Sequence, residues 1–111
     1  MPELPEVETI VRELRDCIIG KRVKDVTELR RGTIVNPLSV DVSRLGNIES
    51  IDRLGKYIII SFSSEYLMII HLRMTGKLVF DESGTSNSKY LRAAIALDNS
   101  ERLLFDDIRT F

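Results

Sequence analysis

The first residues of the chain, Met1-Pro2-Glu3-Leu4-Pro5-Glu6, are of types that can do covalent chemistry. A methionine before a small residue is readily removed, and its removal would leave Pro2 with a free secondary amine. Because an α-amino group has an ordinary pKa of about 7.7–8.0, against about 10.4 for lysine, much more of it is neutral at pH 7. Such an amine can attack a carbonyl-like carbon and form an iminium, while Glu3 and Glu6 move protons.

This chemistry depends on the loss of Met1, because a retained Met1 makes the Pro2 nitrogen a tertiary amide with no nucleophilic lone pair. A plainer interpretation also fits the segment. Proline in the first turn and acids near the positive end are common at helix starts, so Pro5 and Glu6 can be there only to begin a helix. On spacing alone, the plainer interpretation is the commoner one.

Two later segments hold residues suited to a nucleic-acid backbone. Lys56 follows Gly55 at the head of an apolar strand, where its ammonium can meet a phosphate as a point charge. His71 and Arg73 follow an apolar run and can donate to phosphate, and Met74, before a Thr-Gly turn, can wedge between bases. The alternatives are a solvated edge lysine, a structural histidine and a methionine that fills the core.

One amphipathic helix must position the first of these segments. Apolar residues recur on one face of residues 4–18 at the spacing of a helix. They are Val7, Ile10, Val11, Leu14 and Ile18. Gly20 can adopt the left-handed conformation that ends a helix. The helix therefore begins almost at Pro2.

The rest of the chain reads as short strands joined by turns. The strands are predicted at residues 22–29, 48–53, 57–62, 66–72, 77–80, 92–97 and 102–105. Runs 57–60 and 67–70 are apolar without alternation, which predicts strands buried on both faces. Turn residues between the strands favour antiparallel pairing. We expect a mainly β domain, an antiparallel sandwich or barrel with the amino-terminal α-helix packed on it.

Composition limits the class of protein. With 111 residues, 43% hydrophobic and 30% charged, the chain has the size of one globular domain. Its net charge of −1 gives no bulk electrostatic argument for nucleic acid. The single cysteine, Cys17, excludes an internal disulfide, and with only one histidine besides we expect no metal in this chain. No apolar stretch approaches ~18 residues, so we expect no membrane contact and a reducing, cytoplasmic location.

Four segments, taken in order, resemble the formamidopyrimidine-DNA glycosylase family, which also includes endonuclease VIII. They are Pro2-Glu3-Leu4-Pro5-Glu6-Val7-Glu8-Thr9, Gly55-Lys56-Tyr57, His71-Leu72-Arg73-Met74-Thr75-Gly76 and Asp107-Ile108-Arg109-Thr110-Phe111. The first is specific by its position at the terminus, and accidental agreement of all four is improbable. The resemblance favours the catalytic interpretation of Pro2 over the helix-start interpretation.

The resemblance implies excision of oxidised purines such as 8-oxoguanine and formamidopyrimidines from double-stranded DNA, followed by strand cleavage at the abasic site. Pro2 would attack the sugar C1′ and Glu3 would transfer protons to open the sugar. Glu6 would assist within the site, and Lys56 would hold phosphates beside the lesion.

The resemblance also implies a set of DNA-binding residues. His71 would contact the backbone, with Arg73 beside it. Met74, Arg109 and Phe111 would fill the gap left by the flipped nucleotide, with Arg109 facing the orphaned cytosine and Phe111 wedging the stack.

The family continues beyond the segment seen here. Its members carry a helix–two-turn–helix domain and usually a four-cysteine zinc finger, so we expect residues 1–111 to be the amino-terminal catalytic domain of a longer, monomeric bacterial protein associated with the nucleoid. Zinc is expected in that further part, and the isolated fragment is expected to be weak or inactive. The family usually reads Asp-Pro-Arg-Arg-Phe-Gly where this chain has Ile108 and Thr110 in place of the proline and second arginine.

Two other functions stay open from the residues alone. One is a DNA-binding module that kept the fold and lost the chemistry. The other is a structural β-sandwich domain without a nucleic-acid role, in which the terminal segment only starts a helix.

Overall fold

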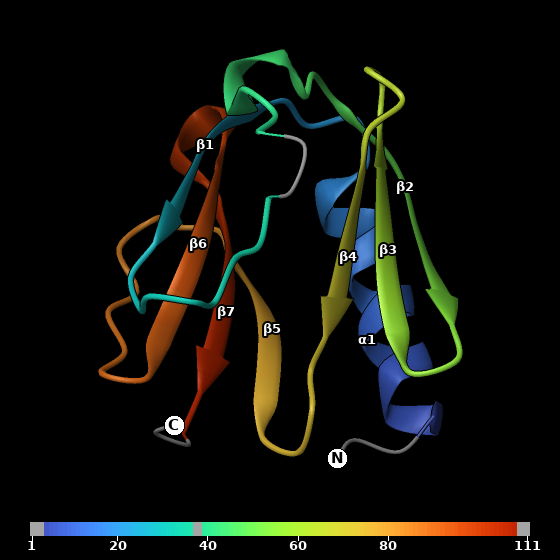
Figure 1. Ribbon diagram of the computed structural model, residues 1–111, viewed down its shortest axis with the longest axis vertical. Coiled ribbons are helices and arrows are strands. Elements are labelled where there is room, and N and C mark those ends of the chain that lie inside the picture. The colour runs from blue at the N-terminus through green and yellow to red at the C-terminus, as the bar shows by residue number, and fades with distance from the viewer. Residues whose placement is uncertain (1–3, 37–38, 109–111) are drawn as a thin grey trace.

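The computed structural model describes residues 4–36 and 39–108 (Figure 1). Within these residues, seven strands form two antiparallel sheets, ordered β1-β6-β7-β5 and β2-β3-β4. The strands are β1 (Val23–Glu28), β2 (Ile48–Leu54), β3 (Tyr57–Phe62), β4 (Leu67–His71), β5 (Gly76–Asp81), β6 (Leu91–Leu97) and β7 (Arg102–Asp107). Helix α1 spans Leu4–Ile18, and 3-10 turns η1 and η2 span Val42–Arg44 and Asp98–Ser100. The predicted antiparallel sandwich with an amino-terminal helix is confirmed.

Helix α1 packs through the face that its sequence predicts. Val7, Val11, Leu14 and Ile18 are buried in one core with residues of both sheets. Gly20 has a φ of +82°, the left-handed cap that only glycine adopts without cost. Its N–H donates to the Ile48 carbonyl over 2.7 Å, so the end of α1 is fixed to the start of β2.

The burial predicted for the apolar runs of β3 and β4 is wrong. Ile58 and Ile60 are fully buried, whereas Leu67 and Ile69 are 58% and 62% exposed. The reason lies in the layers of the fold, because α1 and the other sheet cover only the inner face of β2-β3-β4. Apolar side chains on the outer face, such as Ile69, have no described layer above them.

The pairing of strands brings the singled-out segments to one edge of the molecule. The first turn of α1, the β2–β3 hairpin, the β4–β5 connection and the end of β7 all lie at the lower edge in Figure 1. The register agrees with this view, since Tyr57 pairs with His71 and Gly76 pairs with Asp107. We call this region the site edge.

Candidate functional site

Helix α1 contributes Glu6 to the site edge. Glu6 is exposed and lines an open depression of about 370 Å³ with Pro5, Thr9 and Ile10. The hydroxyl of Thr9 donates to the Pro5 carbonyl over 2.9 Å, which adds a side-chain hydrogen bond to the first turn of α1. Glu6 is therefore accessible to a bound molecule.

Four predicted site residues, Pro2, Glu3, Arg109 and Phe111, lie outside the described residues. The described chain starts two residues after Pro2 and ends at Ile108, the residue before Arg109. Both boundaries belong to elements that end at the site edge (Figure 1). The roles of these four residues remain predictions.

Lys56 occupies the tip of the β2–β3 hairpin. Leu54 and Tyr57 pair directly, so Gly55 and Lys56 form a two-residue loop. Gly55 has a φ of +60°, as a primed hairpin turn requires at its first central residue. Lys56 is exposed and forms no ion pair within the described part of the chain, so its ammonium is available to an anion at this edge.

Arg53 ties the Lys56 hairpin to α1. Its Nε donates to Glu8 over 2.8 Å, and its guanidinium also donates to the Gly55 carbonyl over 3.1 Å. The hydrogen bond from Arg53 holds the pKa of Glu8 below its usual range. The sequence did not predict this role of Arg53. Its partner Glu8 lies on α1, and the two residues meet only when α1 packs against β2.

His71 ends β4 with its ring held from two sides. The ring makes an edge contact with Tyr57, with centroids 5.1 Å apart and planes at 61°. Its Nδ1 accepts a hydrogen bond from the Arg73 backbone N–H over 3.1 Å. A neutral ring with Nδ1 as acceptor carries its proton on Nε2, so that N–H can donate to a phosphate.

The turn Leu72–Gly76 presents Met74 to solvent. The Gly76 N–H donates to the Leu72 carbonyl over 2.9 Å, and a Cβ on Gly76 would lie 2.3 Å from that oxygen. Arg73 has a φ of +59°, an uncommon conformation for a residue other than glycine. Met74 is 61% exposed, so the interpretation of Met74 as core filling does not hold in the described structure.

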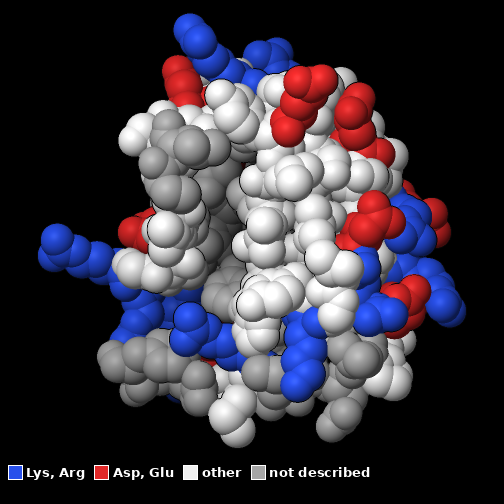
Figure 2. Space-filling view, turned by 45° about the vertical axis from the view of Figure 1, so that its right-hand side comes forward, with Lys and Arg blue, Asp and Glu red and all other residues white. Residues whose placement is uncertain are grey.

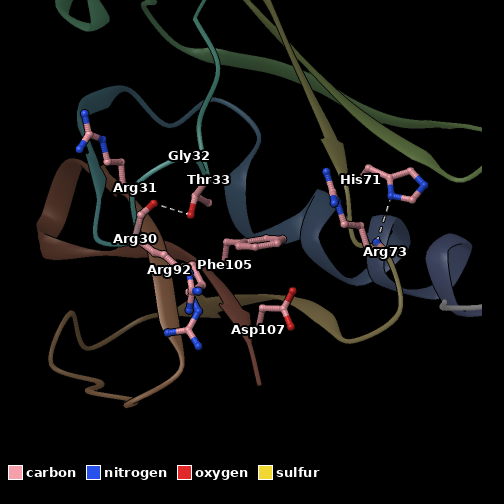
Figure 3. A pocket seen from close by; sticks show the side chains of 9 residues that line it. All are labelled: Arg30, Arg31, Gly32, Thr33, His71, Arg73, Arg92, Phe105 and Asp107. Carbon is pink, nitrogen blue, oxygen red and sulfur yellow. Dashed lines mark hydrogen bonds between the residues drawn. The ribbon is translucent and has the colours of Figure 1, made fainter. Parts of the chain in front are cut away.

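The sequence reasoning did not identify the groove beside this turn. The groove has a volume of about 480 Å³, and its side chains come from both sheets (Figure 3). Its lining residues are Arg30, Arg31, Gly32, Thr33, His71, Arg73, Arg92, Phe105 and Asp107. The dipeptide Arg30-Arg31 before Gly32 is the signal in the sequence that could have indicated it.

Positive side chains concentrate near the site edge although the chain has a net charge of −1. Figure 2 shows several Lys and Arg side chains along the lower part of the face, with others at the top and among the acidic side chains on the right. The groove lining contains four arginines and one acid, Asp107. The net charge of the whole chain therefore does not describe the charge of this groove.

Two absences were checked over residues 4–36 and 39–108. No three His, Cys, Asp or Glu side chains in these ranges are grouped so as to hold a metal ion. No helix in the same ranges is long and apolar enough to cross a membrane.

The sequence and fold match one family throughout. The family model for the formamidopyrimidine-DNA glycosylase N-terminal domain matches residues 1–111. The chain belongs to this family. The glycosylase from Ligilactobacillus salivarius is 41% identical over all of this chain, and that from Moorella thermoacetica is 40% identical. The chain spans 41% and 42% of these two relatives, about two fifths of their length.

Solved structures of glycosylases bound to DNA share the fold. LlFpg with a THF-DNA and an inhibitor matches 99% of this chain with a TM-score of 0.87 and 30% identity, over 42% of its own chain. MutM with DNA containing carbocyclic 8-oxo-G gives a TM-score of 0.86 at 29% identity, with 99% and 42% covered. The glycosylase of Lactococcus lactis with DNA containing FAPY-dG gives 0.81 at 29% identity, with 98% and 42% covered.

In this glycosylase domain the fold brings together the described members of the predicted site. Glu6, Lys56, His71, Arg73 and Met74 lie on elements that meet at the site edge. Of these, His71 and Arg73 are in contact through a hydrogen bond, and both line the groove. No hydrogen bond or ion pair joins Glu6 to Lys56 in the described structure, so the two face the edge from separate elements.

Proposed function

We propose that the protein carrying this chain is a DNA glycosylase of base-excision repair that also cleaves the strand at the abasic site. Its partner is double-stranded DNA with an oxidised purine, such as 8-oxoguanine or a formamidopyrimidine. One observation carries the proposal. In a chain that belongs to this family, the start of α1, the Lys56 hairpin and the Met74 turn meet at the site edge. Relatives bound to DNA with 8-oxo-G or FAPY-dG support the substrate class.

The proposed reaction starts at the amine of Pro2 after Met1 is removed. The nitrogen attacks the sugar C1′, the bond from C1′ to the base breaks and the base leaves with a proton. Glu3 protonates the ring oxygen so that the sugar opens to an iminium on Pro2. Glu6, on the exposed first turn of α1, assists proton movement. The iminium then loses a proton from C2′ as the C3′–O bond breaks and the 3′ phosphate leaves, and water hydrolyses the C=N bond to release Pro2.

Binding residues hold the DNA during this reaction. Lys56 and the Nε2–H of His71 contact phosphates beside the lesion, and Arg73 adds a positive charge. Met74 fills the space of the flipped nucleotide, and Arg109 and Phe111 complete the wedge on the side of the orphaned base. Flipping costs unstacking energy, which a wedge offsets by replacing the lost base contacts.

The further part of the protein is expected to supply the helix–two-turn–helix and a zinc finger, and the whole is expected to act as a monomer at the bacterial nucleoid. The fragment alone is expected to be weak or inactive, because it lacks that DNA-binding surface.

Borohydride trapping of the full-length protein on a duplex with 8-oxoguanine tests the proposal. The matched control is the same protein with a short amino-terminal extension, which turns the Pro2 nitrogen into an amide. We expect a covalent complex only when mass spectrometry shows a free Pro2. A protein with free Pro2 that binds the duplex but is never trapped is a binding module instead, and trapping that persists with the extension would reject Pro2 as the nucleophile.

A further inference from the structure

We propose that His71 is a positioning residue for Met74, through the hydrogen bond that its Nδ1 accepts from the turn that carries Met74. This inference rests on the proposed function, in which Met74 fills the space of the flipped nucleotide. It gives the ring a second task, separate from the phosphate contact proposed for Nε2. Three features of the structure carry it: the packing of the ring, the form of the turn, and the bonds on either side of Met74.

The His71 ring packs against Tyr57 of the neighbouring strand. The two residues pair directly in the ladder between β3 and β4, so their side chains lie on the same face of the sheet. Their rings make an edge contact, with centroids 5.1 Å apart and planes at 61°. Contacts of this kind favour a defined ring geometry. The contact thus helps to orient Nδ1 toward the residues that follow β4.

The bond between His71 and the turn follows the pattern of an Asx-turn. The Arg73 N–H donates to Nδ1 over 3.1 Å, so the acceptor is on the side chain two residues before the donor. Asparagine and aspartate close turns in this way, with an oxygen in the place of Nδ1. Arg73 has a φ of +59°, a conformation that is costly for residues other than glycine and persists where neighbouring contacts hold it. The bond to His71 is one such contact.

Met74 lies between two residues that are bonded to neighbouring strands. Before it, the Arg73 N–H donates to His71 at the end of β4. After it, the Thr75 hydroxyl donates to Asp107 at the end of β7. Met74 itself is 61% exposed. Because most of its side chain lies in solvent, the backbone on either side sets the direction in which it projects.

A histidine can serve the turn and the DNA at the same time. A neutral ring that accepts at Nδ1 carries its proton on Nε2, so the bond to the turn also fixes which nitrogen can donate to a phosphate. Asparagine offers an acceptor in the place of Nδ1 but no group in the place of Nε2. Glutamine reaches the place of Nε2 but offers no acceptor in the place of Nδ1. The two substitutions therefore separate the two tasks of His71.

The test compares His71→Asn with His71→Gln in the full-length protein. Exchange of the Arg73 amide hydrogen with solvent, followed by NMR, reports the turn bond in the absence of DNA. The methyl resonance of Met74, assigned by its loss in Met74→Leu, reports the position of that side chain. The Ser43 amide is the internal control, because it donates over 3.0 Å to the side chain of Asp41, also two residues before it, at the end of the molecule opposite the site edge.

We expect the Arg73 amide to exchange about fivefold faster in His71→Gln, the factor that corresponds to one lost neutral hydrogen bond. His71→Asn should keep the wild-type rate, and the Ser43 amide should keep its rate in both variants. The Met74 resonance should shift further from the wild type in His71→Gln than in His71→Asn. Both variants lose the imidazole ring, so the difference between them reports the turn.

Preference for a damaged duplex extends the test to DNA. Affinities are measured for a duplex with a tetrahydrofuran abasic site and for the same duplex undamaged. Loss of the phosphate contact in His71→Asn should lower both affinities and leave their ratio near the wild-type value. Displacement of Met74 in His71→Gln should reduce the ratio by up to about fivefold, as the binding-competent form of the turn becomes less populated.

Equal exchange rates of the Arg73 amide in the two variants would overturn the inference, and so would equal affinity ratios in variants of a wild type that prefers the damaged duplex. A wild type without that preference would reject the proposed function, and the Arg73 exchange rates and Met74 resonances would still decide whether His71 holds the turn. Failure of borohydride trapping, with the difference between the two variants intact, would reject the proposed chemistry alone.

Discussion

The hydroxyl of Thr75 donates a hydrogen bond to the carboxylate of Asp107, and this bond joins the Met74 turn to the end of β7. Asp107 is 3% exposed, and its backbone pairs with Gly76 in the ladder between β5 and β7. Side chain and backbone together fix the turn that presents Met74 relative to the strand that leads into Arg109. The turn that carries Met74 and the strand that leads into Arg109 are thus connected through the buried carboxylate of Asp107.

Replacing Thr75 by valine should destabilise the domain and loosen the turn. Hydrogen bonds to charged groups contribute about 1.5–3 kcal/mol, and valine keeps the shape while removing the donor. Urea unfolding should show a loss of that order for Thr75→Val and a much smaller loss for Thr75→Ser. Equal losses in the two variants would mean that the hydroxyl is not the stabilising group.

The charge of Lys56 should contribute to the salt dependence of DNA binding. Lys56→Gln removes one ammonium from the β2–β3 hairpin without touching the core, so the salt slope of the full-length protein should fall by about 1. Lys24→Gln is the control, because the start of β1 pairs with Leu97, at the end of β6 remote from the site edge. Titration of a labelled duplex at several salt concentrations measures both. An unchanged slope for Lys56→Gln would place the lysine outside the interface.

Asp81 should make the domain sensitive to acid. Burial alone would raise the pKa of Asp81, but hydrogen bonds from Arg102, Ser83 and the Ser86 N–H outweigh it and hold the pKa below its usual value. A lowered pKa in the folded state means that the stabilisation is complete above about pH 4, the ordinary value for aspartate, and is lost as the pH falls through the folded value.

The Asp81→Asn variant tests this predicted loss of stability at low pH. It should be less stable than the wild type near neutral pH, and the difference in unfolding free energy should shrink below about pH 4. Urea unfolding at a series of pH values gives both curves. A difference that stays constant across the series would assign the effect of Asp81 to shape instead of charge.

The one-sided burial of the β2-β3-β4 sheet predicts unequal costs for two similar isoleucines. Ile60→Ala leaves a cavity at a fully buried position and should cost about 2–5 kcal/mol of unfolding free energy. Ile69→Ala removes a side chain that is 62% exposed and should cost less than about 1 kcal/mol. Chemical unfolding of the 111-residue chain compares them directly. Similar costs would restore the sequence-based expectation that both faces are buried.

Much of the fold could be predicted because periodicity is a local signal. The stripe from Val7 to Ile18 determined both ends of α1, and the run after Lys56 determined β3. The exposure of Ile69 could not be predicted this way, since a run of apolar residues does not tell which layer covers it. The answer depends on the order of strands in two sheets.

The candidate site was likewise predictable only where it depends on local sequence. Lys56, His71 and Met74 stand beside turns, so their types and spacing already indicated chemistry. The groove could not be found in this way, because Arg31, Arg73 and Arg92 are distant in sequence and meet only through the pairing of β1 with β6 and of β5 with β7. Arg53 was missed for the same reason, as its partner Glu8 is on α1.

The central position of β7 has a consequence for how the protein matures on the ribosome. β7 is the final described strand, yet it pairs with both β5 and β6. Neither β5 nor β6 can therefore form its hydrogen bonds with β7 before residues 102–107 have left the ribosome. A nascent chain that stops short of Asp107 exposes two unpaired strand edges, which are prone to join other chains. The groove is finished in the same late step, because Phe105 and Asp107 form part of its lining. Closure of the sheet and completion of this surface therefore both require the synthesis of residues 102–107.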